Sequence, residues 1–306
     1  MDVAVTGSHG LVGSALVTEL TQAGHRAVRV VRGTPAARDE LGWDPPAGVI
    51  DAAGLEEIDA VVHLAGAGIG DKRWTPERKR LILESRTTST DLLARTLAGL
   101  SHKPAVLLSV SGVDYYGPHG EEAITERSPQ GTGFLADVCA RWEAVTKPAE
   151  AAGIRVVRSR TGPVLSADGG LLARLLLPFR MGLGGRVGSG EQYFSWIALD
   201  DHIGAILHLL TLNDAAGAYN HTAPNPVTNR DFTDTLGRVL HRPTMIPTPL
   251  LPLKLRYRSE LVDELLLTGQ RVLPERLEGT GYRFVHPTLE EALRAALDRH
   301  RRRHEP

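Results

Sequence analysis

The residues from Val3 to Gly13 constrain the fold more than any other stretch, because they read as a buried strand, a glycine turn and the start of a helix. Gly7 can take the tight turn at the strand end, Gly10 lets a phosphate approach the backbone, and Gly13 lets the helix pack on the strand. Apolar residues recur with helical spacing over 11–23, so the free N–H groups at the helix start would face an anion. The GxxGxxG spacing predicts a pyrophosphate-binding turn, with a turn that holds no ligand as the alternative.

A second strand is predicted over 27–32, and it ends on an arginine. Arg32 lies 19 residues past Gly13. Near this point of a dinucleotide-binding fold a carboxylate would accept from the ribose 2′-OH of NAD, whereas an arginine can pair with the 2′-phosphate of NADP. The sequence therefore predicts NADP(H) as the cofactor. His9, inside the glycine turn, could assist that phosphate or could be a surface histidine without a ligand.

Strands and helices then alternate along the chain. Apolar strands are predicted over 59–66, 105–111 and 154–160, and helices over 76–100 and 133–152. This alternation predicts a parallel, doubly wound sheet with right-handed crossovers. Residues 33–58 are rich in Pro, Gly and Ala, so we expect a mostly irregular excursion with a short strand near 49–50. Glycines at 66, 68 and 70 predict a loop that is mobile or lies close against a ligand.

Glycine clusters punctuate the chain past Thr161 and predict a loop over 182–196 that could lie over a pocket. Asp200 and Asp201 are interpreted as the cap of a helix over 203–212, with a ligand role as the alternative. Two further helices are predicted over 229–241 and 289–299. We expect the basic run that follows, from Arg299 to His304, to be a solvated or disordered tail.

Composition limits the classes of function. The 35 basic and 36 acidic residues are interspersed, so no field of one sign points to nucleic acid or a membrane surface. A single cysteine, Cys139, excludes an intramolecular disulfide and fits a cytoplasmic protein. No apolar run of about 18 residues predicts a membrane span, and the 12 histidines lack the spacing of a metal site. At 306 residues and 42% hydrophobic content, the chain can fold as a large α/β domain with a smaller one appended.

Three motifs together, Gly7 to Gly13, His63 to Gly66 and Ser109 to Gly117, resemble the extended and atypical short-chain dehydrogenase/reductases. The resemblance is closest to the branch labelled NAD-dependent epimerase/dehydratase or epimerase family proteins, and it covers essentially the entire chain. Further stretches resemble that branch: Asp71–Trp74, Ser85–Arg86, Tyr115–Gly117, Cys139–Glu143, Arg160–Gly162, Pro178–Gly185 and Gly269–Leu277.

The resemblance implies an α/β fold with a Rossmann-type doubly wound parallel sheet and a smaller mixed C-terminal lobe. Residues 1–165, with contributions from 198–222, would form the NADP-binding domain. Residues 166–306 would form the substrate cleft and C-terminal lobe, including a family-specific module of unknown function over 253–300. The cofactor contacts expected on this basis are Gly7, Ser8, His9, Gly10, Leu11, Val12, Gly13, Arg32, Leu64, Ala65, Gly66, Ser109, Gly162 and Pro163.

The usual catalytic residues of this superfamily are incomplete here. In most members a serine acts with a YxxxK pair, whose tyrosine moves a proton and whose lysine lowers the pKa of that tyrosine. Ser111 stands where the serine is expected, but Leu135 and Cys139 occupy the expected Tyr and Lys positions. The branch also usually has a glutamate after its Leu-Ala-Gly, and this chain has Ala67 there.

Three interpretations of that gap stay open. Tyr115 or Tyr116 could supply a phenol, with packing beside the cofactor as the alternative. Arg86 or Lys72 could polarise a substrate carbonyl, because a cation lowers the barrier to a developing alkoxide. The protein could instead bind NADP without catalysis, as a sensor or partner-binding protein. Cys139 is interpreted as a buried structural thiol rather than a nucleophile, because no paired histidine is near it in sequence.

Substrate contacts are expected in and beside the loop over 182–196. Arg180 or Arg186 could meet an anionic group, with helix capping or surface ion pairs as the alternative. Gln192 is a further candidate, and Trp196 could form an aromatic wall or pack the two lobes together. The sequence thus predicts an NADP(H)-dependent oxidoreductase or epimerase acting on a small oxygenated, sugar-like or carbonyl substrate. The helices over 76–100 and 133–152 would form the contact if the protein is a homodimer, as they commonly do in relatives.

Overall fold

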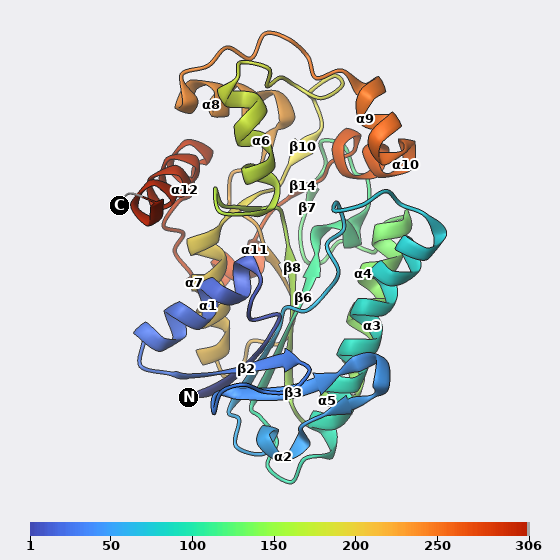
Figure 1. Ribbon diagram of the computed structural model, residues 1–306, viewed down its shortest axis with the longest axis vertical. Coiled ribbons are helices and arrows are strands. Elements are labelled where there is room, and N and C mark those ends of the chain that lie inside the picture. Colours follow the sequence, from blue (N-terminus) through green and yellow to red (C-terminus); the bar gives the residue numbers. More distant parts are fainter. Residues whose placement is uncertain (305–306) are drawn as a thin grey trace.

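An eight-stranded sheet runs through the centre of the computed structural model, which describes residues 1–304 (Figure 1). The strands lie in the order β12-β8-β6-β5-β1-β2-β3-β4. Their bounds are β1 (Asp2–Thr6), β2 (Arg26–Arg32), β3 (Glu40–Asp44), β4 (Val49–Ile50), β5 (Ala60–His63), β6 (Val106–Gly112), β8 (Arg155–Thr161) and β12 (Gly217–His221). All neighbours are parallel except β3 and β4. The chain winds outward from β1 in both directions, which confirms the predicted doubly wound, Rossmann-type sheet.

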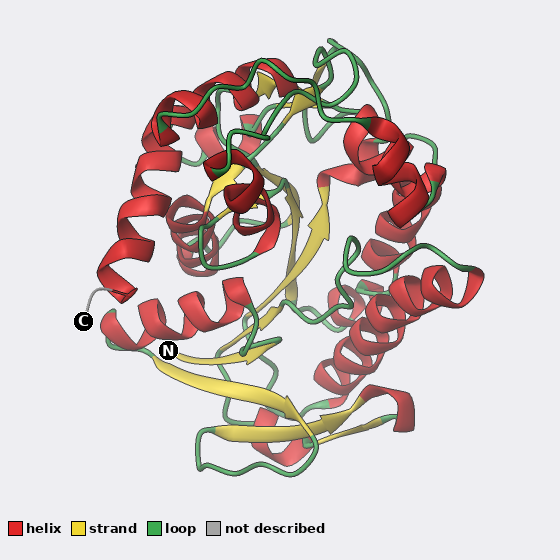
Figure 2. Ribbon diagram, turned by 45° about the horizontal axis from the view of Figure 1, so that its top comes forward, coloured by secondary structure: helices red, strands yellow, loops and turns green. Residues whose placement is uncertain are grey.

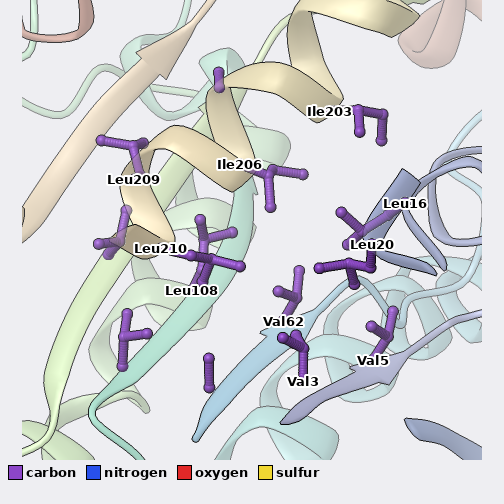
Figure 3. Close-up of a cluster of buried hydrophobic side chains, with 14 of the residues drawn as sticks. Val3, Val5, Leu16, Leu20, Val62, Leu108, Ile203, Ile206, Leu209 and Leu210 are labelled. Atoms are coloured by element: carbon purple, nitrogen blue, oxygen red, sulfur yellow. The ribbon is translucent and has the colours of Figure 1, made fainter. Parts of the chain in front are cut away.

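Helices cover both faces of this sheet, as Figure 2 shows. On one face α1 (Leu11–Gln22) and α7 (Leu199–Thr211) bury apolar side chains against β1, β5 and β6 (Figure 3). The other face packs against α3 (Pro76–Gly99) and α5 (Lys147–Ala151). Each buried leucine or valine contributes about 1.5–3 kcal/mol relative to an exposed one, so the two layers hold the sheet rigid.

Two expectations about this half of the chain are wrong. Residues 40–44 are not irregular: β3 pairs with β2 and extends the sheet, and the buried Trp43 packs in its core. The helix predicted over 133–152 is interrupted, because α4 (Phe134–Ala144) ends before α5 begins. At the break the Thr146 hydroxyl donates to the Glu143 carbonyl at 2.7 Å, and Pro148 has no N–H with which to continue the ladder.

A smaller lobe forms a separate core. It packs α6 (Gly170–Arg180), α8 (Asn229–Leu240) and α12 (Leu289–His304) against short strand pairs. The pairs in this core are β9 (Val164–Leu165) with β11 (Ile197–Ala198) and β10 (Tyr193–Phe194) with β13 (Val227–Thr228). A third pair, β7 (Ala123–Ile124) with β14 (Arg271–Val272), packs instead against Val113 and Tyr116. This lobe matches the mixed character that we expected.

The C-terminal third contains more helix than predicted. Besides α8 and α12 it forms α9 (Leu250–Tyr257), α10 (Ser259–Val262), the π-helical turn η3 (Asp263–Leu267) and α11 (Glu275–Gly279). No side chain of α9 is buried, so the sequence there lacks the apolar period that marks a packed helix. Tertiary contacts hold its end instead, because Arg73 donates to the carbonyls of Leu255 and Arg256.

Two further expectations are corrected near α7. Ala198, not an aspartate, is the N-cap of α7, and Asp201 instead accepts from the backbone N–H groups of Val285 and His286 at 2.6 and 3.0 Å. The run from Arg299 is not an unstructured tail, because α12 continues to His304 and Arg299 pairs with Asp200. Residues 305–306 of the predicted C-terminal lobe lie outside the described residues. Among the helices of residues 1–304, no segment combines the length and apolar character that crossing a membrane requires.

Candidate functional site

The glycine turn between β1 and α1 is shaped by backbone packing. Gly7 has φ +65°, and a Cβ there would lie 2.9 Å from the Leu64 carbonyl carbon. A Cβ on Gly13 would lie 2.8 Å from the Ser8 Cα and would overlap the Gly7 carbonyl oxygen. Gly10 is the N-cap of α1 and offers no side-chain cap. The turn therefore leaves the amide groups at the start of α1 facing outward without a side-chain acceptor, as a phosphate site needs.

Hydrogen bonds from β2 and from the end of β5 hold this turn in place. The Ser8 carbonyl accepts from Arg29 Nη1 at 3.1 Å, whereas the buried Ser8 Oγ has no partner among the described residues. Thr6 Oγ1 accepts from the N–H groups of Leu64 and Ala65 at 3.1 and 3.3 Å, which ties β1 to the end of β5. Sequence reasoning missed Arg29, because a half-buried arginine inside a strand carries no motif.

Arg32 lies exposed at the end of β2, on the same edge of the sheet as the glycine turn. Within residues 1–304 its guanidinium forms no hydrogen bond or ion pair. His9 is also exposed. An unpaired guanidinium on the same sheet edge as the glycine turn is free to bind a phosphate group.

The other expected cofactor contacts follow β5, β6 and β8. Leu64, Ala65 and Gly66 come directly after β5, and Ser109 pairs in register with His63 in β5. Gly162 follows β8, and a Cβ there would overlap the Ser195 carbonyl oxygen. These residues and Pro163 thus gather at the carboxyl edge of the sheet, where open α/β folds bind ligands.

Three arginines hold the glycine-rich loop over 66–71. Arg86 Nη1 donates to the Ala67 carbonyl at 2.9 Å, Arg78 donates to Gly68, and Arg174 Nη1 donates to Gly70 at 2.8 Å. Because Arg174 belongs to α6, this loop also joins the two lobes. These contacts hold the loop against α3 and α6, which argues against a mobile loop; its predicted approach to a ligand stays a prediction.

Arg86 is itself buried, and its guanidinium stacks 5.0 Å from the Trp142 ring. Its Nη1 also donates to the Ile82 carbonyl at 3.0 Å. Burial lowers the pKa of the Arg86 guanidinium, which still stays protonated in proteins. The described contacts therefore give Arg86 a structural task in addition to any electrostatic one, whereas Lys72 lies exposed on the surface.

The end of β6 brings four groups together. Ser111 Oγ is buried and makes no hydrogen bond of normal geometry within residues 1–304, although it lies beside the Cys139 thiol. A Cβ on Gly112 would lie 3.2 Å from Asp114 Oδ2 and 3.5 Å from Cys139 Sγ. The Asp114 carboxylate thus lies against the strand end, in space that only a glycine leaves free.

Cys139 and Asp114 differ in the pKa that their surroundings give them. Burial, together with the charge of Asp114, raises the pKa of the Cys139 thiol to about 12, so the thiol stays protonated, as its structural interpretation requires. Burial also raises the pKa of Asp114 to about 6; the charge of Glu264 adds to this effect and that of Arg86 opposes it. Sequence reasoning gave Asp114 no role, although it lies within the Ser109–Gly117 motif, because the two tyrosines beside it are the more usual proton donors. Glu264 was passed over because it stands in no recognised motif.

The two tyrosines after β6 differ. Tyr116 is fully buried; its hydroxyl donates to Asn220 Oδ1 at 2.7 Å and accepts from Arg160 Nη1 at 3.0 Å. Burial raises the pKa of Tyr116 to about 12. Tyr115 is half-buried, with the Arg160 guanidinium 3.4 Å above its ring. The Tyr116 hydroxyl is therefore committed to a structural network, which favours its packing role over proton transfer.

The expected substrate residues do not form one cluster. Trp196 is fully buried in the core of the smaller lobe, which supports lobe packing and leaves no aromatic wall at that position. Arg186 donates to the Ser189 carbonyl at 2.7 Å and so braces its own loop. Gln192 donates to the Val187 carbonyl at 3.0 Å and to the Leu266 carbonyl at 2.7 Å, which joins the loop to η3. Arg180 lies elsewhere: it lines a hollow of about 330 Å³ whose other walls are formed by residues of 239–242, Leu297 and Arg301.

Within residues 1–304, no group of three or more His, Cys, Asp or Glu side chains is arranged to hold an ion.

Comparison with known proteins fits this geometry. Residues 3–222 match the NAD dependent epimerase/dehydratase family, and residues 248–296 match a domain of unknown function (DUF1731). The chain belongs to the NAD dependent epimerase/dehydratase family. The family resemblance stated from the motifs is therefore confirmed.

Relatives within this family match over nearly the full chain. An epimerase family protein of Mycobacterium tuberculosis is 43% identical over 297 residues, which cover 97% of this chain and 98% of the relative. The crystal structure of human epimerase family protein SDR39U1 with NADPH has a TM-score of 0.89 at 34% identity, covering 97% of this chain and 99% of that one. A nucleoside-diphosphate sugar epimerase from Corynebacterium glutamicum has a TM-score of 0.77 at 35% identity, covering 96% of this chain and 58% of the other.

Proposed function

We propose that this protein is an NADP(H)-dependent oxidoreductase or epimerase that acts on a small oxygenated substrate. The observation that carries the proposal is the glycine turn, whose outward amides lie on the same sheet edge as the unpaired Arg32. The NADPH in the human relative, at 34% identity, supports the choice of cofactor.

The residues present fit a phosphorylated dinucleotide. Gly7, Gly10 and Gly13 give a pyrophosphate access to the start of α1, and Arg32 would bind the 2′-phosphate. The buried, unpartnered Ser8 Oγ is a further donor at the turn. When bound, NADP(H) supplies hydride transfer at its nicotinamide ring. The protein's task is to orient that ring at the carboxyl edge of the sheet and to handle the proton of the substrate oxygen.

Residues 1–165 with 198–222 would form the cofactor domain, and 166–306 the substrate side. The name of the Corynebacterium relative supports a sugar-like substrate, including one with a diphosphate. Arg186 and Gln192 are the residues of the 182–196 loop that would meet it, once a ligand replaced their present carbonyl partners. A homodimer through α3 and α4 would use their outer faces, because Leu261 and Leu265 pack against Ile82 of α3 and Leu135 of α4.

A noncatalytic NADP-binding protein is the second candidate, because Leu135 and Cys139 are both buried and neither can replace the YxxxK pair. One experiment separates the two. Purified protein is titrated with NADPH and with NADH, and hydride transfer from NADPH to a panel of small ketones and nucleotide-linked sugars is followed. The proposed enzyme binds NADPH more tightly and reduces at least one member of the panel. Tight binding without any transfer would favour the sensor, and no binding of either dinucleotide would overturn both.

A further inference from the structure

We propose that Asp114 is the proton-transfer residue of this site, and that Glu264, carried by the C-terminal module, is the positioning residue that controls it. The inference rests on the proposed function and deepens it. Glu264 lies within residues 248–296, which match the domain of unknown function, so the inference assigns that domain a role in proton transfer.

Asp114 lies where such a residue is needed. It follows β6 directly, in the short helix η2 (Val113–Tyr116), at the same sheet edge as the glycine turn. Gly112 makes room for its Oδ2, as the 3.2 Å approach to a Cβ at that position shows. Asp114 is only partly buried.

The Asp114 carboxylate differs from three other carboxylates of the described residues in accepting no hydrogen bond from another residue; the donor that it has is its own backbone N–H. Glu143 forms an ion pair with Arg160 at 2.8 Å, Asp201 accepts from the N–H of Val285 at 2.6 Å, and Glu126 accepts from the N–H of Asn220 at 2.9 Å. Within residues 1–304, no other residue donates a hydrogen bond to Asp114. A carboxylate that no other residue hydrogen-bonds keeps acceptor positions free for a proton or a ligand.

Titratable and charged groups near Asp114 come from several of the elements packed around it. Arg160 of β8 lies over the Tyr115 ring of η2 and is paired with Glu143 of α4. Ser111 of β6 and Cys139 of α4 are neutral, Arg86 of α3 is cationic, and Glu264 of η3 is anionic. Ser111 Oγ also lacks a partner of normal geometry. A hydroxyl and a carboxyl group at one strand end, neither of them hydrogen-bonded by another residue with normal geometry, match the two hydrogen bonds that a substrate carbonyl or alcohol oxygen can make.

Glu264 is fixed by α4 rather than by a cation. Its carboxylate oxygens accept from the N–H groups of Phe134 and Leu135 at 3.3 and 3.2 Å, at the first turn of α4. The helix start holds the charge in place, and the C-terminal module thereby sets a fixed anion beside Asp114. The negative charge of Glu264 favours the protonated form of Asp114 and adds to the effect of burial on its pKa.

In the reducing direction the substrate carbonyl carbon accepts a hydride from NADPH, and the π electron pair of the C=O bond takes the proton from Asp114 to form the O–H bond. The Asp114 carboxylate then regains a proton from solvent. In the oxidising direction the carboxylate accepts the alcohol proton as the hydride leaves.

The first test is the variant Asp114→Asn, with Asp137→Asn as the control because Asp137 is an exposed carboxylate on α4. We expect Asp114→Asn to bind NADPH within twofold of the parent protein and to reduce ketones about 10²–10⁴ times more slowly, the usual contribution of a positioned acid. Asp137→Asn should leave both unchanged. Unchanged ketone reduction in Asp114→Asn would overturn the inference while leaving the proposed function intact.

The second test needs no turnover. An infrared pH titration follows the protonated carboxyl band that disappears in Asp114→Asn. We expect its midpoint near pH 6 in the parent protein, and a lower midpoint in Glu264→Gln. Asp263→Asn, which removes the neighbouring partner of Lys254, should leave the midpoint unchanged. A midpoint in the usual aspartate range, or no shift in Glu264→Gln, would overturn the inference even if no ketone is reduced.

Discussion

The glycine turn and the end of β6 lie on the same edge of one sheet, but they are built in different ways. The turn is made of backbone atoms from a single stretch, Val3 to Gly13. The cluster at β6 is made of side chains from α3, η2, α4 and η3, the last of them Glu264. A backbone site tolerates little change in shape and needs no particular charge. A side-chain site depends on charges that single substitutions can reset, so the two should fail in different ways.

The largest effect is expected at the turn. Gly13→Ala places a methyl group against the Gly7 carbonyl oxygen and Ser8 Cα, so the helix must move off the strand. We expect a loss of about 3 kcal/mol in the free energy of unfolding and NADPH binding weakened at least about tenfold. Gly99→Ala is the control, since nothing lies near a Cβ there, and it should be neutral or slightly stabilising. Normal NADPH affinity in Gly13→Ala would show that the turn is not the phosphate site.

A smaller effect is expected from charge at the cofactor site. Arg32→Asp should weaken NADPH by about 2 kcal/mol, because a charge-assisted contact to the 2′-phosphate is lost. NADH binding should change little, and an exposed substitution away from the site, Arg80→Asp, should change neither. Calorimetric titration of both dinucleotides measures the difference. Equal losses for NADPH and NADH would remove the basis for NADP selectivity.

The β6 cluster should instead respond to pH. Because the pKa of Asp114 in the folded protein is raised from 3.8 to about 6, the folded state holds its proton more tightly than the unfolded chain does. The stability from this residue is complete below about pH 4 and is lost as pH rises through 6. Asp114→Asn should therefore raise the free energy of unfolding at pH 8 by about 1–2 kcal/mol, discounted for partial exposure, and by less at pH 4. Denaturant unfolding at both pH values checks this, and an equal effect at both would contradict it.

The smallest effect is expected where the lobes meet at the glycine-rich loop. Arg174 is largely exposed, so Arg174→Ala should cost less than about 1 kcal/mol in the free energy of unfolding. Arg86→Met should cost more, because it removes buried donors from the Ala67 and Ile82 carbonyls. Thermal unfolding compares the two variants. A larger loss for Arg174→Ala would mean that the loop is held mainly from the smaller lobe.

The same contrast explains what the sequence could predict. The glycine turn, the strand that ends on Arg32 and the helix that begins at Pro76 are local features, and each was predicted from spacing alone. Strand β3 was missed because its pairing with β2, rather than its own Gly- and Pro-flanked residues, makes it a strand. The break between α4 and α5 was missed because the apolar period continues past Thr146 while the backbone ladder does not.

The β6 cluster was beyond sequence reasoning for a further reason. Glu264 lies 150 residues after Asp114 in the sequence, and its effect depends on the N–H groups of α4 that hold it. Trp196 illustrates another limit of the sequence. Its place beside the predicted loop allowed either an aromatic wall or lobe packing, and only the structure shows that its side chain is fully buried. The sequence places Ser111, Tyr115 and Tyr116 near the sheet edge. It cannot show that the Tyr116 hydroxyl is hydrogen-bonded while Ser111 Oγ is not.

A crystal structure with NADPH bound tests the account most directly. We expect the pyrophosphate against the backbone from Gly7 to Gly13, the 2′-phosphate on Arg32, and the nicotinamide ring in contact distance of a pocket bounded by Ser111 and Asp114. A nicotinamide ring far from these two side chains, or a dinucleotide bound away from the glycine turn, would contradict it.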